Sequence, residues 1–223
     1  MKAMILAAGR GERMRPLTDR VPKALLDLCG RPLVAWLIDR LRAGGIREVV
    51  MNHAHLGATI EAALGDGTRL GVSIRYSPEK TALGTAGGIA NALPLLGEAP
   101  FLGANADVFC DIDFSGLVGR GLEDALAHLV LVDNPEHHPD GDFTLIGDRV
   151  GNAAGDRLTF SGVGLYSPAL FAGIRRGDQA QLAPLLRDAA ADGRVSGEHF
   201  RGCWVDVGTP ERLAALNQAL SRK

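Results

Sequence analysis

Short apolar runs recur along the first 140 residues and are separated by turns rich in glycine and proline. Residues 3–8 contain no polar side chain and end at a glycine, which is typical of a strand buried on both faces of a sheet. Residues 46–52, 72–76, 101–105 and 127–132 are also rich in apolar residues, with a few polar side chains among them. We therefore predict that these segments are strands of a largely parallel sheet.

Amphipathic segments lie between the apolar runs and predict helices. The first begins at Pro32 and ends at the pair Gly44-Gly45, the usual placement of proline and glycine at helix ends. Residues 57–64 predict a shorter helix, and a glycine loop at 84–88 is expected to lead into another that ends at Leu93. Alternating strands and helices indicate an open sheet that is covered on both faces.

The pattern changes after about residue 140. Residues 143–150 and 158–166 predict two antiparallel strands around a polar turn, followed by helices at 180–192 and from Thr209 to the end. The fold class is therefore expected to be α/β, a Rossmann-like three-layer sandwich with a mostly parallel mixed sheet and a small antiparallel lobe facing the substrate. Without a linker or internal repeat, residues 1–223 are expected to form one domain.

Composition narrows the class of protein. The 223 residues carry a net charge of −2, which gives no reason to expect a nucleic-acid or membrane surface. Three widely spaced cysteines suggest neither a disulfide framework nor a metal site, so a reducing compartment fits. The apolar run after Met1 is too short for a signal peptide, and we expect a cytoplasmic protein. No obligate protein partner is evident.

Positive charge gathers near the start of the chain, around a glycine loop. Residues 1–31 hold seven basic side chains against three acidic ones, and Arg10, Arg13 and Arg15 fall within the loop after the first strand. Glycines let a phosphate approach the backbone N–H groups, and arginines add planar charged donors. This segment therefore predicts a site for a small polyanion, although glycine spacing alone would equally fit a solvated surface loop.

Two common nucleotide-binding loops do not match this segment. No Gly-Lys-Ser/Thr follows, so it is not a Walker A loop. Met14 replaces the third glycine of a dinucleotide fingerprint, and the second strand ends at Asn52-His53, where a ribose-binding acid would be expected. These differences disfavour a nicotinamide-dependent dehydrogenase.

Four further motifs have types of residue that suit phosphate chemistry. Pro22-Lys23 precedes an apolar segment, so the lysine could point back into the glycine loop. Leu83-Gly84-Thr85-Ala86-Gly87 offers backbone groups beside a helix start, with Thr85 as its expected cap. Asn105-Ala106-Asp107 follows a strand, at the sheet edge where open α/β sheets bind ligands. Asp206 lies in Trp204-Val205-Asp206-Val207-Gly208-Thr209. Each motif alone could be an ordinary surface lysine, helix start or turn.

Together these motifs resemble the signature of the sugar-1-phosphate nucleotidyltransferase family, L-x-A-G-x-G-x-R-x-x-P-L-T followed by P-K-x-L. Ala106 replaces the usual glycine of its N-G-D motif. The resemblance implies a nucleotide-binding half at 1–125 and a sugar-binding half at 126–223. It implies catalytic roles for Arg13, Lys23 and Asp107, a Mg²⁺ ion held by Asp107 and Asp206, and contact between Asn105 and the sugar phosphate. The nucleotide-binding residues it implies are Ala8, Gly9, Gly11, Glu12, Arg13, Lys23, Gly84 and Thr85.

Other segments resemble a bacterial uridylyltransferase branch of this family, among them residues 52–57, 132–138 and 141–143. This branch implies UTP and N-acetylmuramic acid α-1-phosphate as substrates, in peptidoglycan recycling, with Gly141 and Asp142 near the sugar. His137-His138 is expected to be a solvated loop and not a metal site. A mannose- or glucose-1-phosphate nucleotidyltransferase using GTP or dTTP stays open. So does an inactive homologue that senses nucleotide sugars, although the retained motif residues argue against it.

Overall fold

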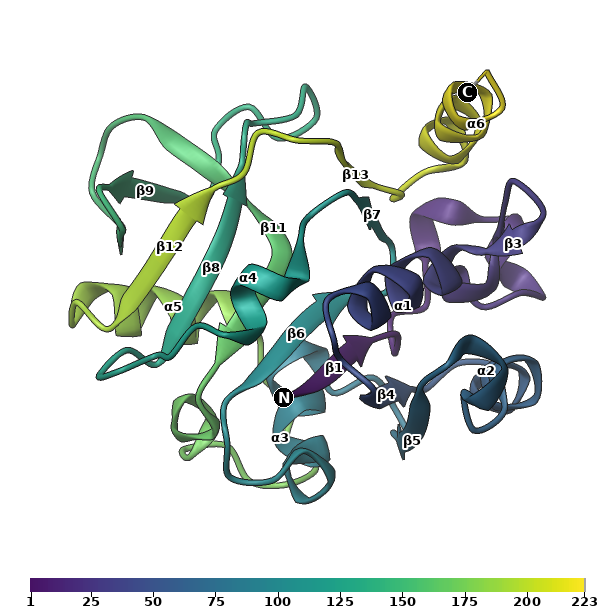
Figure 1. Ribbon diagram of the computed structural model, residues 1–223, viewed down its shortest axis with the longest axis horizontal. Helices are drawn as coiled ribbons and strands as arrows, with labels where there is room; N and C mark the ends of the chain where they lie inside the picture. The colour runs from purple at the N-terminus through teal and green to yellow at the C-terminus, as the bar shows by residue number, and fades with distance from the viewer. Residues whose placement is uncertain (223) are drawn as a thin grey trace.

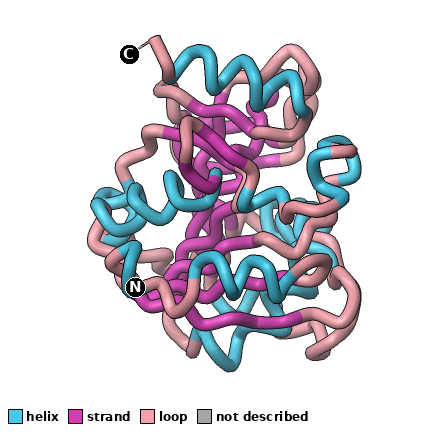
Figure 2. The backbone as a smooth tube through the Cα atoms, turned by 90° about the vertical axis from the view of Figure 1, so that its right-hand side faces the viewer, coloured by secondary structure: helices cyan, strands magenta, loops and turns pink. Residues whose placement is uncertain are grey.

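The computed structural model describes residues 1–222 as a mixed sheet between layers of helices (Figures 1 and 2). The helices are α1 (Leu33–Ala43), α2 (Gly57–Leu64), α3 (Gly84–Leu96), α4 (Phe114–Val118), α5 (Leu182–Ala191) and α6 (Pro210–Leu220). The strands are β1 (Lys2–Leu6), β2 (Asp27–Leu28), β3 (Arg31–Pro32), β4 (Glu48–His53), β5 (Ser73–Pro78), β6 (Phe101–Asn105), β7 (Val108–Cys110), β8 (Ala127–Val132), β9 (Phe143–Ile146), β10 (Arg149–Gly151), β11 (Arg157–Tyr166), β12 (Val195–His199) and β13 (Trp204–Asp206).

The main sheet has nine strands in the order β5-β4-β1-β6-β11-β8-β12-β10-β9. The strands from β5 to β6 are parallel to one another, and β11 runs antiparallel between β6 and β8. The chain leaves β1 for β4 on one side and later returns to pair with β1 through β6 on the other. This reversal at β1 is the kind of switch point at which open α/β sheets bind ligands.

The end of the sheet formed by the second half of the chain closes on itself. β9 pairs with β10 and also with the first residues of β11, where Leu158 lies opposite Phe143. The ring β11-β8-β12-β10-β9 therefore leaves no free edge for β9. Its apolar side chains, including Leu129, Phe143 and Val195, belong to the buried cluster that α3 and α5 cover.

Helices bury apolar side chains against both faces of the sheet. α1 contributes Val34, Leu37 and Ile38 to a core that includes Ile5 and Val49. Figure 1 shows α1 and α4 in front of the sheet and α3 behind it. Fully burying one such aliphatic side chain contributes roughly 1.5–3 kcal/mol. The three-layer α/β sandwich predicted from the sequence is therefore confirmed.

A third apolar cluster fixes the C-terminal helix beside the glycine loop. α6 contributes Leu213 and Leu216, which pack with Met14 of the loop and with Phe109 of β7. The amide of Asn217 adds to this packing, because its Oδ1 accepts a hydrogen bond from Cys29 N at 2.7 Å. Residues near the two ends of the chain are thus held together, as the position of α6 near β3 in Figure 1 shows.

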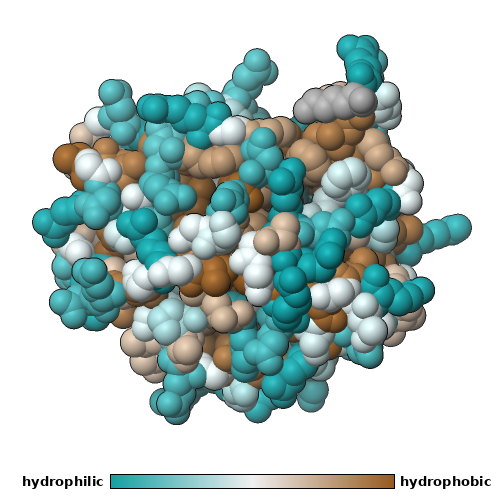
Figure 3. Space-filling view, viewed as in Figure 1, coloured by the Kyte–Doolittle hydropathy of each residue, from teal (hydrophilic) through white to brown (hydrophobic). Residues whose placement is uncertain are grey.

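Hydrophilic and hydrophobic residues are mixed on the face of the molecule that Figure 3 shows. In the view of Figure 3, hydrophilic residues are spread across the face and separate the hydrophobic ones. Across residues 1–222, no helix has both the length and the apolar character needed to span a bilayer. Burial raises the pKa of the Cys110 thiol to about 11, so this side chain stays protonated at neutral pH and acts as a small apolar group.

Some predicted elements were wrong in detail. Residues 84–88 are the first turns of α3 and not a loop, and Thr85 is not its cap, because Leu83 occupies that position without a side-chain hydrogen bond. Residues 143–150 are not one strand, because the chain turns at Gly147 between β9 and β10. Five strands were not predicted: β2, β3, β7, β12 and β13.

Candidate active site

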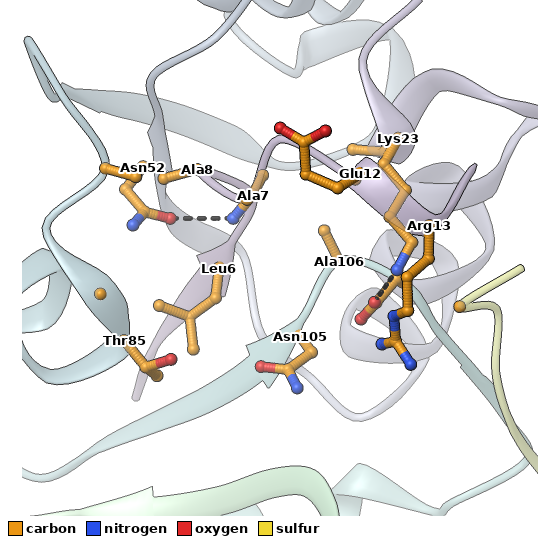
Figure 4. Close-up of a pocket in the computed structure, with 17 residues that line it drawn as sticks. Leu6, Ala7, Ala8, Glu12, Arg13, Lys23, Asn52, Thr85, Asn105 and Ala106 are labelled. Atoms are coloured by element: carbon orange, nitrogen blue, oxygen red, sulfur yellow. Dashed lines mark hydrogen bonds and ion pairs between the residues drawn. The ribbon is translucent and has the colours of Figure 1, made fainter. Parts of the chain in front are cut away.

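The predicted phosphate and acid motifs meet in one cavity at the carboxyl end of β1. Leu6, its last residue, is in register with Asn52 of β4 and with Asn105 of β6. The loops that follow these strands therefore converge, and they enclose a cavity of about 360 Å³ (Figure 4). It is lined by Leu6, Ala7, Ala8, Gly9, Gly11, Glu12, Arg13, Lys23, Ala24, Asn52, Ala82, Gly84, Thr85, Asn105, Ala106, Asp107 and Gly208.

Local packing shapes the glycine loop. Gly11 has a φ of 72°, and a Cβ there would lie 3.0 Å from Cγ2 of Thr18, so a larger residue would be strained. The hydroxyl of Thr18 donates a hydrogen bond to the Gly11 carbonyl at 2.8 Å and ties the loop to residues further along the chain. Arg13 follows in the next turn, and Figure 4 shows its side chain close to Lys23 and Asp107.

Lys23 reaches the cavity as the sequence suggested. It begins a short 3₁₀ turn after Pro22, and its ammonium group forms an ion pair with Asp107 Oδ2 (Figure 4). The two side chains are only 15% and 28% exposed, so water screens this pair less than it screens a surface pair. A cation is therefore held at the end of the sheet, next to the glycine loop.

Asp206 is brought to Asp107 by a short antiparallel ladder. β13 pairs with β7 so that Asp206 lies opposite Val108, and Val207 N donates a hydrogen bond to the Asp107 carbonyl at 2.8 Å. The Oδ1 atom of Asp206 receives Nη1 of Arg212 at 2.5 Å and lies 3.1 Å from Nε2 of His137. Both acids are therefore neighbours in the backbone ladder, and each has a cationic or hydrogen-bonding partner.

Two residues that sequence reasoning missed hold the far wall of the cavity. Asn52 Oδ1 accepts a hydrogen bond from Ala7 N at 2.9 Å, while its Nδ2 donates to Glu79 Oε1 at 2.6 Å. The other oxygen of Glu79 accepts from Leu83 N at 2.8 Å, directly before α3. Asn52 and Glu79 are both buried, so this chain of bonds fixes the start of α3 relative to β1. Polar residues at strand ends were the signal that could have identified them.

Replacing Glu79 with alanine is expected to destabilise the fold by about 2–4 kcal/mol. The change leaves two donors without their partner, the Asn52 amide and the Leu83 N–H, and each unsatisfied buried donor costs about 1–3 kcal/mol. Chemical denaturation of the variant and the parent measures the difference. Glu79→Gln, which keeps one acceptor oxygen, should lose less, and equal midpoints for parent and alanine variant would contradict the role assigned to this carboxylate.

At the end of β6, Asn105 is positioned by an irregularity in β11. The register of β11 against β8 shifts between Phe160 and Gly164, and Gly162 has a φ of 79°. A Cβ at Gly162 would collide with the Asn105 amide. Glycine at this position therefore lets the asparagine lie against β11 while it lines the cavity.

Gly141 and Asp142 are not among the residues that line the cavity. Asp142 accepts hydrogen bonds from Phe160 N at 2.8 Å and from His138 Nε2 at 3.1 Å, and Gly141 has a φ of 59°. These contacts join the 134–142 loop to β11. The neighbouring histidines point to different acids, since His137 faces Asp206 and His138 faces Asp142. The loop predicted to be merely solvated is thus held by both imidazoles.

The structure thus brings together ten of the predicted site residues around one cavity. Asp206 is not among the lining residues, but Gly208, two residues further on, is one of them. The pairing of β7 with β13 holds Asp206 next to the site. Within residues 1–222, no cluster of three or more His, Cys, Asp or Glu side chains could hold a metal ion by itself. The lining residues among the predicted set are Ala8, Gly9, Gly11, Glu12, Arg13, Lys23, Gly84, Thr85, Asn105 and Asp107.

Known proteins resemble the chain in sequence and in fold. Residues 2–147 match the family model described as "Nucleotidyl transferase". A Neisseria meningitidis serogroup B protein named N-acetylmuramate alpha-1-phosphate uridylyltransferase is 56% identical over 220 residues, which cover 96% of this chain and 95% of the relative. A Caulobacter vibrioides protein of the same name is 37% identical, covering 98% of this chain and 96% of the relative.

Solved structures add evidence on the fold. A Bacillus anthracis structure described as a glucose-1-phosphate thymidylyltransferase in complex with sucrose superposes with a TM-score of 0.86 at 22% identity. The match covers 100% of this chain and 96% of that one. At this identity the likeness establishes a shared fold.

Proposed function

We propose a reaction from the premise that this chain belongs to the nucleotidyl transferase family. The enzyme transfers a uridylyl group from UTP to N-acetylmuramic acid α-1-phosphate and releases pyrophosphate, which makes it a step of peptidoglycan recycling. The names of the two relatives support this choice of substrates. The observation that carries it is the meeting of the glycine loop, Lys23 and Asp107 around one cavity at the switch point of the sheet.

The nucleotide is proposed to occupy the half of the cavity formed by residues 1–125. The triphosphate would bind to backbone N–H groups from Ala8 to Glu12 and to the guanidinium of Arg13, because both kinds of group donate hydrogen bonds. Among the lining residues, the acids that could compete for these donors are Glu12 and Asp107. Gly84 and Thr85, on the opposite wall, would contact the base. The Asn52–Glu79 hydrogen bonds keep this wall at a fixed distance from β1.

Nucleotidyltransferases of this family generally use a divalent metal ion, and Mg²⁺ is the proposed ion here. Two carboxylates, that of Asp107 just before β7 and that of Asp206 at the end of β13, suit its preference for oxygen ligands, with phosphate oxygens and water completing about six. Lys23, the present partner of Asp107, could exchange that acid for a phosphate oxygen. When bound, Mg²⁺ would neutralise charge on the phosphates.

The protein's own part in the reaction is to position two anions and compensate their charge. An oxygen of the sugar phosphate, already ionised near neutral pH, forms a bond to the α-phosphorus of UTP as the bond to the β-phosphate oxygen breaks. No general base is required. Lys23 and Arg13 would offset the charge that accumulates at the α-phosphate, and Asn105 would orient the sugar phosphate for attack in line.

The sugar is proposed to lie over the half formed by residues 126–223. Gly141 and Asp142 would act there by shaping the 134–142 loop against β11, in agreement with their hydrogen bonds. We place the reaction in the cytoplasm, an assignment that the free thiols of Cys29, Cys110 and Cys203 support.

The reaction is tested by measuring pyrophosphate release from all pairs of UTP, dTTP and GTP with N-acetylmuramate, glucose and mannose 1-phosphates. Release is expected to be fastest with UTP and N-acetylmuramate 1-phosphate, and to disappear when a chelator removes divalent ions. Release restricted to GTP and mannose 1-phosphate would overturn the choice of substrates. No release from any pair would overturn the enzymatic proposal and favour a sensing role.

A further inference from the structure

The rim of the cavity carries a guanidinium and an imidazole, those of Arg212 and His137, which the proposed reaction has not used. The guanidinium of Arg212 lies over Gly208, a residue of the cavity lining, so a side chain at 208 would collide with it. Arg212 Nη1 donates to Asp206 Oδ1 at 2.5 Å and to His137 Nε2 at 2.6 Å. A helix residue and a loop residue 75 positions apart thus meet beside one carboxylate, and the imidazole holds the guanidinium there.

The backbone segments that carry both residues are anchored by the fold. α6 is fixed by its packing on Met14 and Phe109 and by the bond between Asn217 and Cys29. The loop that carries His137 is fixed through Asn134, whose Nδ2 donates to the carbonyls of Pro139 and Arg157, both at 2.9 Å. Ligand binding by side chains on an anchored backbone does not require the backbone to be ordered first, which lowers the entropic cost of binding.

The guanidinium of Arg212 needs a further acceptor when Asp206 is engaged elsewhere. A metal ion bound at Asp206 Oδ1 would take up one lone pair of that oxygen, so the oxygen could accept fewer hydrogen bonds and its charge would be shared with the metal. Among residues 1–222, Asp206 is the acid that Arg212 reaches as an ion pair, so the guanidinium would then face the cavity rim with its charge only partly compensated. Arg212 is only 20% exposed, which makes an anionic partner at that point more favourable than water alone.

We propose that Arg212, positioned by His137, binds the carboxylate of the acidic sugar and thereby selects it over neutral sugars. The inference rests on the proposed function, since N-acetylmuramic acid is N-acetylglucosamine with a lactic acid ether on O3. This carboxylate adds a charge beyond the phosphate at C1. Arginine binds a carboxylate through two parallel hydrogen bonds, and Arg13 and Lys23 are already assigned to the triphosphate side.

The test compares N-acetylmuramate 1-phosphate with N-acetylglucosamine 1-phosphate, which lacks only the lactyl group. With UTP and Mg²⁺, Arg212→Gln is expected to raise KM for the acidic sugar at least about tenfold, whereas kcat and the turnover of the neutral sugar change little. His137→Gln should act in the same direction with a smaller effect. Arg212→Lys should recover part of the loss. Calorimetric titration of UDP-N-acetylmuramate and UDP-N-acetylglucosamine measures the same discrimination without turnover.

Control measurements separate this role from others. His199→Gln removes an imidazole that pairs with Asp133 and not with Asp206, so it should leave the preference unchanged. The Mg²⁺ concentration for half-maximal rate should not rise in Arg212→Gln, because the guanidinium then no longer competes with the ion for Asp206. Equal losses on both sugars would overturn the proposal and assign Arg212 to pyrophosphate or to the support of Asp206. A parent enzyme that fails with UTP and N-acetylmuramate 1-phosphate would instead overturn the proposed function.

Discussion

Replacing Asp107 with asparagine is expected to lower kcat by about 1,000-fold or more, the size of loss seen when a preorganised electrostatic group is removed from an active site. The substitution keeps the shape of the side chain but removes one of the two carboxylates that β7 and β13 bring together. It also leaves Lys23 without its ion-pair partner. Pyrophosphate release at saturating substrates measures the effect.

The matched control for this variant is Asp111→Asn. Asp111 follows the same strand, but its carboxylate accepts a hydrogen bond from Cys203 N at 2.7 Å and does not line the cavity. This variant should keep activity within about threefold of the parent, because surface substitutions of this kind usually change stability by about 0.5 kcal/mol or less. Near-parental activity of Asp107→Asn would refute the assignment of Asp107 as a metal ligand.

Replacing Lys23 with alanine is expected to lower kcat by about 100- to 1,000-fold, because a cation placed at a phosphate stabilises the charge that develops there. The KM for UTP should rise as well, since the same ammonium group faces the bound triphosphate. Steady-state rates at varied UTP separate the two effects. Lys23→Arg restores the charge in a planar group that cannot occupy the same point, so it should recover only part of the activity.

The control for Lys23 is Lys80→Ala, which removes a lysine from an exposed position. Its activity should match that of the parent. Thermal unfolding with and without UTP shows whether Lys23→Ala is inactive only because it is unfolded. In that case, UTP would not restore its thermal stability. We expect a folded variant whose melting temperature falls by only a few degrees, because the Lys23 and Asp107 side chains both keep some contact with water.

The sequence by itself determined the elements that depend on local pattern. The apolar run of β1, the proline and glycine that bound α1, and the span of α2 were all visible, because burial and helix ends leave a mark within a few residues. The motifs after these strands also identified the side chains of the cavity, from the glycine loop to Asp107. Strand ends in a parallel sheet meet at one edge, so their proximity followed from the order of elements.

Only the tertiary structure decided how distant segments complete the site. β7 and β13 have three residues each, too few for any periodicity, and they form because each pairs with the other across nearly 100 residues of chain. That ladder sets Asp206 beside Asp107 and leads into α6, which carries Arg212, while the loop between β8 and β9 brings His137 to the same carboxylate. The closure of β9 on β11 and the helical start at Gly84 were likewise decided by non-local contacts, because a backbone N–H or carbonyl takes whichever partner the folded chain brings within reach.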